Sequence, residues 1–192
     1  MKQSIMLTAM AAATLGLGAG AAHAEKYQDA AQSFRNATQS AEFFKHSYAY
    51  AVFPTVGQGG FGVGAAHGRG RVYTHGTQVG DTSVTQLSVG WQVGGEAYSE
   101  IIFFEDKRAL DEFESGTFEF SAGASVVAIT AGASAGVGTL GADAGASAGM
   151  NDAKVVGKYN KGMAVFTIVK AGLMYDASLQ GERFSFTANN RT

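Results

Sequence analysis

The sequence predicts a mainly β domain of the α+β class, with antiparallel strands in a sheet, barrel or sandwich. It also predicts an N-terminal amphipathic helix and a short middle helix. Three observations support this prediction: polar and apolar residues alternate over residues 81–104, glycine is abundant (27 of 192 residues) while proline occurs once, and helical spacing is confined to residues 27–48 and 106–114. Alternation is the period of a strand, whereas spacing by three and four is that of a helix.

Residues 81–104 are the stretch around which we expect the core to form. One face carries Thr85, Leu87, Val89, Trp91 and Val93, and the other carries Gln86, Ser88, Gly90, Gln92 and Gly94. This alternation predicts a strand with one buried face. At roughly 3.3 Å per residue a straight strand would be far too long, so we expect a bend at Gly94-Gly95. The run Ile101-Ile102-Phe103-Phe104 is apolar on both faces, which predicts a central strand covered on both sides.

The first 24 residues have the pattern of a secretory signal peptide. Lys2 precedes an uncharged stretch over residues 5–22, which ends in Ala22-His23-Ala24. We expect cleavage after Ala24, export to the periplasm, and a single domain over residues 25–192. The chain has no cysteine, which is compatible with export and excludes a lipoprotein anchor, a thiol nucleophile and a cysteine-based metal site.

Residues 27–48 show the spacing of an amphipathic helix. Its apolar or small positions are Tyr27, Ala30, Ala31, Phe34, Ala37, Ala41, Phe44 and Tyr48. The simplest interpretation is a helix packed on a sheet, and the alternative is a helix lying on a membrane surface. Acidic and basic residues are balanced along it, so attraction to anionic lipid would depend on insertion of its aromatic side chains.

Two glycine-containing motifs match known functional patterns, but the sequence around them does not fit those functions. We expect a strand over residues 49–53 that ends at Pro54, followed by a G-x-G-x-x-G pattern that begins at Gly57. No helical period follows that pattern, so small residues that allow a close backbone approach explain it better than a dinucleotide site. G-x-S-x-G occurs twice within residues 121–150, but every histidine lies upstream, against the order of a hydrolase triad.

The remaining segments complete the predicted sheet. Asp106 is a candidate N-cap for a helix with Leu110 and Phe113 on its apolar side and Gly116 after its end. Residues 121–150 are rich in Gly, Ala and Ser, and we interpret them as two or three strands, with disorder and a transmembrane helix as alternatives. Four short extended segments are expected at residues 154–159, 163–169, 173–179 and 183–187, separated by turns at 160–162, 171–172 and 180–182.

The sequence contains no residue set typical of an active site. His67 and His75 lack a third ligand at a suitable spacing, and Glu96 with Glu100 is a conceivable carboxylate pair that we interpret as a solvated edge. We therefore expect no catalytic residues, no metal and no cofactor. The net charge of −2 excludes electrostatic attraction to nucleic acid.

Several motifs together resemble the SYLF domain, a lipid-binding domain of actin-associated endocytic proteins, plant FYVE proteins and exported bacterial proteins. The motifs in order are Ala49-Tyr50-Ala51-Val52-Phe53-Pro54, Gly59-Gly60-Phe61-Gly62-Val63-Gly64, Gly68-Arg69-Gly70-Arg71-Val72, Gly90-Trp91-Gln92-Val93-Gly94-Gly95, Ile101–Phe104 and residues 170–181. The resemblance covers nearly all of residues 25–192 and implies binding to phospholipids, notably phosphoinositides in eukaryotic members. Actin bundling belongs to eukaryotic members and is not expected of an exported protein.

We therefore expect a periplasmic, non-enzymatic module that binds a phospholipid membrane. The expected apolar contacts are Phe34, Phe44 and Tyr48, and the expected phosphate contacts are Arg35, Lys45, Arg69, Arg71 and Lys170. The alternatives are a small outer-membrane β-barrel, although the chain ends on polar residues, and a structural envelope protein that self-associates as a homo-oligomer.

Overall fold

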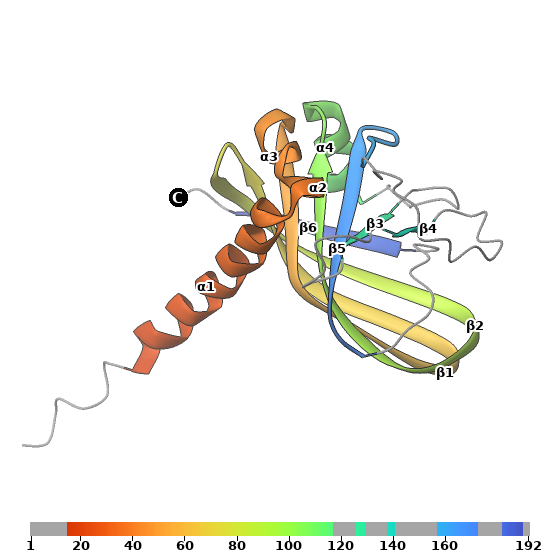
Figure 1. Cartoon of the computed structure of the whole chain (residues 1–192). Helices are drawn as coiled ribbons and strands as arrows, with labels where there is room; N and C mark the ends of the chain where they lie inside the picture. The colour runs from red at the N-terminus through yellow and green to blue at the C-terminus, as the bar shows by residue number, and fades with distance from the viewer. Residues whose placement is uncertain (1–14, 117–125, 130–137, 141–156, 173–181, 190–192) are drawn as a thin grey trace, which may run out of the picture.

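The structure is a computed structural model, and it describes residues 15–116, 126–129, 138–140, 157–172 and 182–189. The described elements are α1 (Leu15–Asn36), α2 (Thr38–Ala41), α3 (Phe43–His46), β1 (Ala49–Thr74), β2 (Thr77–Phe104), α4 (Lys107–Glu114), β3 (Val126–Ile129), β4 (Gly138–Leu140), β5 (Met163–Gly172) and β6 (Glu182–Ala188). The strands form one open sheet in the order β1-β2-β5-β3-β4, with β6 also paired to β2 (Figure 1). All pairs are antiparallel except β3 with β5, so the predicted mainly β class is confirmed.

The sheet is organised around a long hairpin of β1 and β2, which we call the ribbon. Its register runs from Ala49 opposite Phe104 to Thr74 opposite Thr77. The connecting residues His75 and Gly76 both have positive φ (50° and 79°), as a two-residue turn matched to strand twist requires. The predicted strand end at Pro54 is wrong. The register shifts between Phe53 and Val56, and this irregularity accommodates a residue that has no N–H to donate.

The ribbon bends back on itself, so that the two halves of each strand face one another across a concave side (Figure 1). A Cβ on Gly70 would lie 2.6 Å from the ring of Phe53, and one on Gly68 would lie 2.7 Å from Val56 Cγ2. Gly68 and Gly70 therefore permit a close approach, mainly by Phe53 and Val56 of the same strand. A Cβ on Gly57, where the glycine motif begins, would meet nothing within 4 Å. Gly94 and Gly95, where we expect a bend, keep their β1 partners without a register shift. The register shift lies instead between Phe61 and Val63, where β2 has extra residues.

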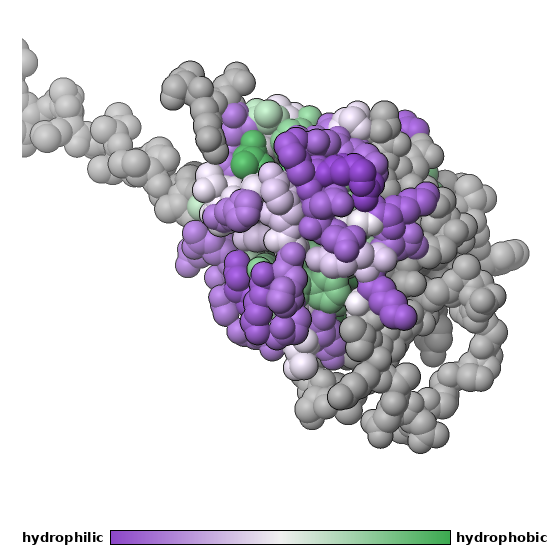
Figure 2. All heavy atoms as spheres, turned by 90° about the horizontal axis from the view of Figure 1, so that it is seen from above, coloured by the Kyte–Doolittle hydropathy of each residue, from purple (hydrophilic) through white to green (hydrophobic). Residues whose placement is uncertain are grey.

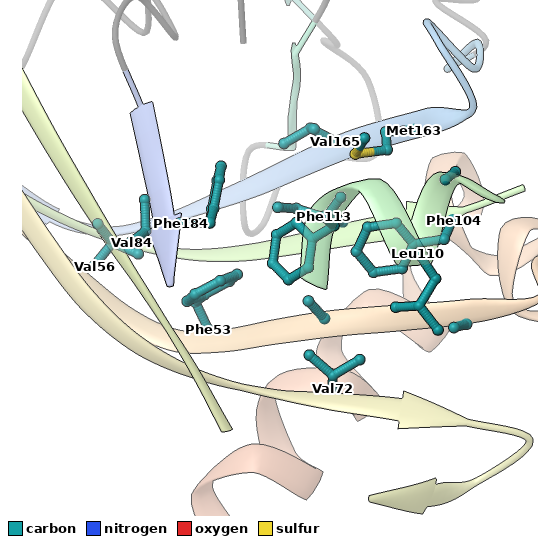
Figure 3. Close-up of a cluster of buried hydrophobic side chains, with 14 of the residues drawn as sticks. Phe53, Val56, Val72, Val84, Phe104, Leu110, Phe113, Met163, Val165 and Phe184 are labelled. Carbon is teal, nitrogen blue, oxygen red and sulfur yellow. The ribbon is translucent and has the colours of Figure 1, made fainter. Parts of the chain in front are cut away.

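One hydrophobic core fills the concave side of the ribbon. The bend divides the ribbon into two arms: the first carries the turn at His75-Gly76, and the second carries the paired residues Ala49 and Phe104. The ring of Phe53, in the second arm, lies 5.9 Å from that of Phe184 of β6, and the ring of Phe184 lies 5.1 Å from that of Phe113 of α4, measured between centroids. Figure 3 shows these rings converging with Val56, Val72 and Val84 between the strands and α4. The concave core thus joins both arms of the ribbon to α4, β5 and β6.

A second core covers the convex side, where α1 packs on the sheet. Tyr27 and Phe34 of α1 are buried with Ile101 and Phe103 of β2 and Phe166 of β5. The neighbouring residues Ile102 and Phe104 belong to the concave core, which confirms that this run is covered on both faces. Within the described residues no helix is long and apolar enough to cross a membrane.

The predicted continuous helix over residues 27–48 is wrong. The chain leaves α1 at Ala37, which has an extended backbone, and the helical segment beyond it is divided at Glu42 into α2 and α3. Ser40 Oγ, which is buried, donates to the carbonyl of Phe34 at 2.6 Å and satisfies an acceptor near the end of α1. The division turns Phe43 and Phe44 onto the sheet, where both rings contact Phe103.

The predictions for α4 and for the turn before β5 are confirmed, and those for the C-terminal segments are confirmed in part. Asp106 accepts a hydrogen bond from Ala109 N at 2.8 Å and caps α4, and Gly116 (φ 67°) follows its end. Lys161 and Gly162 both have positive φ in the predicted turn before β5. The predicted segment 183–187 lies in β6, whereas the predicted turn at residues 171–172 lies inside β5.

Alternation in β2 identifies the strand but not its buried face. Gln86 is 4% exposed, whereas Leu87 is 69% exposed and Thr85 is exposed. The side chains from Ser88 to Gly94, Trp91 among them, lie outside the described residues. So do most of the glycine-rich residues 121–150, of which β3 and β4 are described as strands, and the predicted segment 173–179.

Candidate functional site

The convex side carries two arginines supported by aromatic rings beside α1. We call this set the arginine–aromatic surface; it comprises Arg35, Arg71, Tyr27, Phe44, Tyr50 and Tyr73. Odd-numbered residues of this part of β1 point to the convex side, because Val72 and Gly70 point to the concave core. The strand therefore places Arg69, Arg71 and Tyr73 on the face on which α1 lies.

Arg35, in the last turn of α1, lies over two aromatic rings. Its Cζ is 4.0 Å from the ring centroid of Phe44 and 6.0 Å from that of Tyr50. Burial raises the pKa of Tyr50, and the positive charge and a hydrogen bond of Arg35 oppose that rise. Among the described residues no carboxylate forms an ion pair with Arg35, so aromatic rings hold the guanidinium and its donors can reach a ligand oxygen.

Arg71 occupies a similar position on β1. Its Cζ lies 4.2 Å from the ring centroid of Tyr27, and its Nε lies 3.6 Å from Asp81 Oδ1. Nε is buried without a hydrogen-bond partner among the described residues. Burial raises the pKa of Tyr27, with Arg71 opposing the rise. Arg69, on the same face of β1, is exposed.

The other predicted membrane contacts are more scattered. Phe34 is 0% exposed in the convex core, so in this arrangement it could reach a bilayer only if α1 left the sheet. Tyr48 packs against the concave core, and its ring lies 5.5 Å from that of His75. Lys45 Nζ binds Glu42 at 2.7 Å, and Lys170 Nζ lies 3.5 Å from Thr55 Oγ1. The structure thus brings together Arg35, Phe44, Arg71 and Arg69, but not all eight predicted residues.

The end of the molecule that carries α3 and α4 is mostly hydrophilic, with small hydrophobic areas between the polar side chains (Figure 2). Its charges are largely paired within the helices: Lys107 binds Asp111 at 2.7 Å, and Arg108 binds Glu112 at 2.8 Å. Such exposed pairs leave little net charge. This end is therefore a weaker candidate for anion binding than the convex side.

The concave side contains a chemical feature that sequence reasoning missed. Glu100 of β2 and Glu182 of β6 are both 0% exposed, and all four carboxyl oxygens lack a hydrogen-bond partner among the described residues. Burial raises the pKa of Glu100 to about 8, and burial followed by the charge of Glu100 raises that of Glu182. The interpretation of Glu96 and Glu100 as a solvated edge is wrong for Glu100. The position of Glu100 directly before the apolar run Ile101–Phe104 was a local signal of burial. No such signal accompanies Glu182.

The described side chains were compared with the requirements of a metal site. These residues contain no group of three or more His, Asp or Glu side chains able to hold a metal ion. His67 Nδ1 lies 3.4 Å from Thr85 Oγ1, and His75 packs on Tyr48, so the two histidines contact different neighbours.

Comparison with known proteins decides the family. The family model described as "Las17-binding protein actin regulator" (Ysc84) matches residues 85–191, more than half of the chain. This chain belongs to the Ysc84 (SYLF) family. The resemblance predicted from the sequence is therefore confirmed. At the coarsest level, membership of the Ysc84 family supports a lipid-binding type of module.

A relative in the Ysc84 family comes from a bacterium. Beta cell expansion factor A of Aeromonas veronii is 30% identical over 92 residues, which cover 48% of this chain and 28% of that protein. The aligned region thus spans little more than a quarter of that relative. No solved structure matches the chain.

Proposed function

We propose that this Ysc84-family protein is a non-enzymatic module that binds phospholipid at a membrane surface through its arginine–aromatic surface. The observation that carries the proposal is that Arg35 and Arg71 each lie over an aromatic ring on one side of the molecule. A guanidinium held by a ring keeps its N–H donors, and its planar fork matches the oxygens of a phosphate. The rings themselves suit the boundary between headgroups and acyl chains.

Apolar contact with the bilayer would come in two stages. Phe44 is partly buried beside Arg35 and is near enough to the surface to accompany it. Phe34 would contribute only after α1 is displaced from the sheet, because it lies in the convex core. Phosphoinositide selectivity would require further cations, for which Arg69 and Lys170 are candidates, since Lys45 is engaged by Glu42.

Vesicle co-sedimentation of the full chain tests the proposal. We expect binding to phosphatidylcholine vesicles that contain phosphatidylglycerol or a phosphoinositide, and weaker binding to phosphatidylcholine alone. Each charge-assisted hydrogen bond is worth about 1.5–3 kcal/mol, so Arg35→Gln/Arg71→Gln should weaken binding by roughly tenfold or more. Arg108→Gln, which removes a charge from α4 on the concave side of the sheet, is the control. Equal binding by the double variant and the control would exclude this surface.

We also propose export to the periplasm, where actin is not expected as a partner. Residues 15–24 form the first part of α1, and the residues that pack on the sheet, Tyr27 to Phe34, lie beyond the predicted cleavage point. Cleavage would thus leave the docked part of α1 intact. Recovery of the protein from the periplasmic fraction with Glu25 as its first residue would support export, and an intact N-terminus in the cytoplasm would contradict it.

A further inference from the structure

The buried carboxyl groups of Glu100 and Glu182 have no role in the proposed lipid contact, which lies on the opposite side of the sheet. Each residue is 0% exposed, and each carboxyl group lacks a hydrogen-bond partner among the described residues. An ionised carboxylate without a partner is very costly in a protein interior, because it loses its hydration. Neither solubility nor packing therefore explains why two carboxyl groups are buried here.

The two carboxyl groups lie at different arms of β2: Glu100 belongs to β2 itself, and Glu182 belongs to a strand that pairs with β2. β6, which carries Glu182, pairs with the first arm from Gly80 to Gln86, whereas Glu100 lies in the second arm, which pairs with β5. Phe53 faces Glu100 across the ladder and contacts Phe184, two residues after Glu182. Both acidic side chains therefore lie beside the region where the bent ribbon closes on itself, and the charge of Glu100 acts on Glu182.

Among the residues that the structure describes, the groups around the two carboxyls offer no compensating positive charge. At the cross-strand positions of Glu100 lie Phe53 on β1 and Thr167 on β5, and at that of Glu182 lies Gln86 on β2. None of these side chains titrates. The titratable neighbours on β2 are Tyr98 and Glu96. Desolvation raises the pKa of Tyr98, and the charges of Glu100, Glu182 and Glu96 raise it further.

We propose that Glu100 and Glu182 form a proton-operated clamp that joins the two arms of the bent ribbon. With both carboxyl groups protonated, the pair is neutral and both groups remain in the core, so the two arms stay closed. When the pair becomes fully ionised, two like charges face each other without water, and the arms are driven apart. This proposal is independent of lipid binding.

The direction of the pH effect follows from the raised pKa values of both groups. In the unfolded chain each glutamate loses its proton near its ordinary pKa, whereas the folded protein retains it to higher pH. The folded state therefore binds more protons between the two values, and its stability falls as pH rises through that range. The contribution of the clamp is full below the ordinary pKa of glutamate, falls as pH rises above it, and is lost by about pH 8, where Glu100 titrates.

Thermal unfolding of the full chain between pH 5 and pH 9 tests the clamp. We expect the melting temperature of the wild type to fall by roughly 5 °C or more across this range. Glu100→Gln and Glu182→Gln keep the shape but cannot ionise, so each should flatten the dependence. Glu105→Gln, which alters an exposed glutamate next to β2, is the matched control and should retain the wild-type profile. A flat wild-type profile, or an unchanged slope in Glu100→Gln/Glu182→Gln, would overturn the proposal.

Two further measurements keep the proposal testable if the variants fold poorly. Carboxyl ¹³C resonances of glutamate-labelled wild type should include two that titrate well above the rest, and ordinary titration of every glutamate would contradict the clamp. Thermal unfolding at pH 9 with and without Ca²⁺ or Mg²⁺ should show no cation-specific recovery. Recovery in the wild type that is absent in Glu100→Gln would instead make the pair a cation site and overturn the proton clamp.

Discussion

The two sides of the bent ribbon differ in where their charged side chains lie. On the convex side, Arg35 and Arg71 lie over aromatic rings near the surface. On the concave side, Glu100 and Glu182 are buried without hydrogen-bond partners among the described residues. The same β2 strand separates the two environments, since its successive side chains point to opposite faces.

This difference separates a binding role from a structural one. A supported arginine at the surface can exchange water for a phosphate at little cost, because its rings already orient it. A buried carboxyl group cannot exchange partners without opening the fold. Ligand binding should therefore respond to changes on the convex side, and stability and its pH dependence should respond mainly to changes on the concave side.

The largest expected effects come from removing one buried ring on each side. Phe113→Ala and Phe34→Ala should each cost about 3–5 kcal/mol, the usual range for deletion of a buried phenylalanine. Phe113 joins α4 to β6 and β2, so its loss should lower the free energy of global unfolding. Phe34 holds α1, so its loss should release that helix first.

Denaturant unfolding combined with hydrogen exchange distinguishes the two outcomes. Phe34→Ala should raise exchange in α1 while β2 and β5 stay protected, whereas Phe113→Ala should raise exchange throughout the strands. If Phe34→Ala also increased vesicle binding, displacement of α1 would be part of membrane contact. Uniform exchange in both variants would remove the distinction between a detachable convex helix and a cooperative concave core.

Sequence reasoning predicted the elements whose causes are local. The α4 helix has its cap and its terminating glycine within one short segment, and the turn before β5 contains Lys161-Gly162. The arginine–aromatic surface was predicted in part, because Arg35 and Phe44 are near in sequence and Arg71 lies on a recognisable motif. The rings of Tyr27, Tyr50 and Tyr73 that support the arginines were missed, since they meet only when α1 folds onto β1.

The features that depended on distant contacts could not be predicted. Hydropathy alternation favours burial of Leu87, yet the bend of the ribbon and its pairing with β6 bury Gln86 instead. Pro54 would end an ordinary strand, but a register shift accommodates it inside β1. The Glu100–Glu182 pair joins residues that are far apart in the chain, so neither local pattern nor spacing indicated it.

An intermediate effect should come from the glycines that allow the ribbon to bend. Gly70→Val would place a Cβ 2.6 Å from the ring of Phe53 and 2.8 Å from Thr82 Cγ2, so we expect destabilisation of about 1–3 kcal/mol or more. Gly57→Val is the matched control on the same strand, because a Cβ there meets nothing within 4 Å. Chemical denaturation measures both, and equal costs would show that the arms do not close as tightly as the contact of Phe53 with Gly70 requires.

The smallest effect expected concerns the cap that fixes α4 over the concave core. Asp106 accepts a hydrogen bond from Ala109 N at 2.8 Å, so Asp106→Ala should cost about 1 kcal/mol of unfolding free energy. Asp111→Ala, which removes an exposed carboxylate paired with Lys107 in the same helix, should cost less than about 0.5 kcal/mol. Because α4 covers the concave core and not the arginine–aromatic surface, vesicle binding should be unchanged in both variants. A loss of binding in Asp106→Ala at a temperature where the protein is folded would mean that the two sides of the ribbon are coupled, and the division of roles between them would fail.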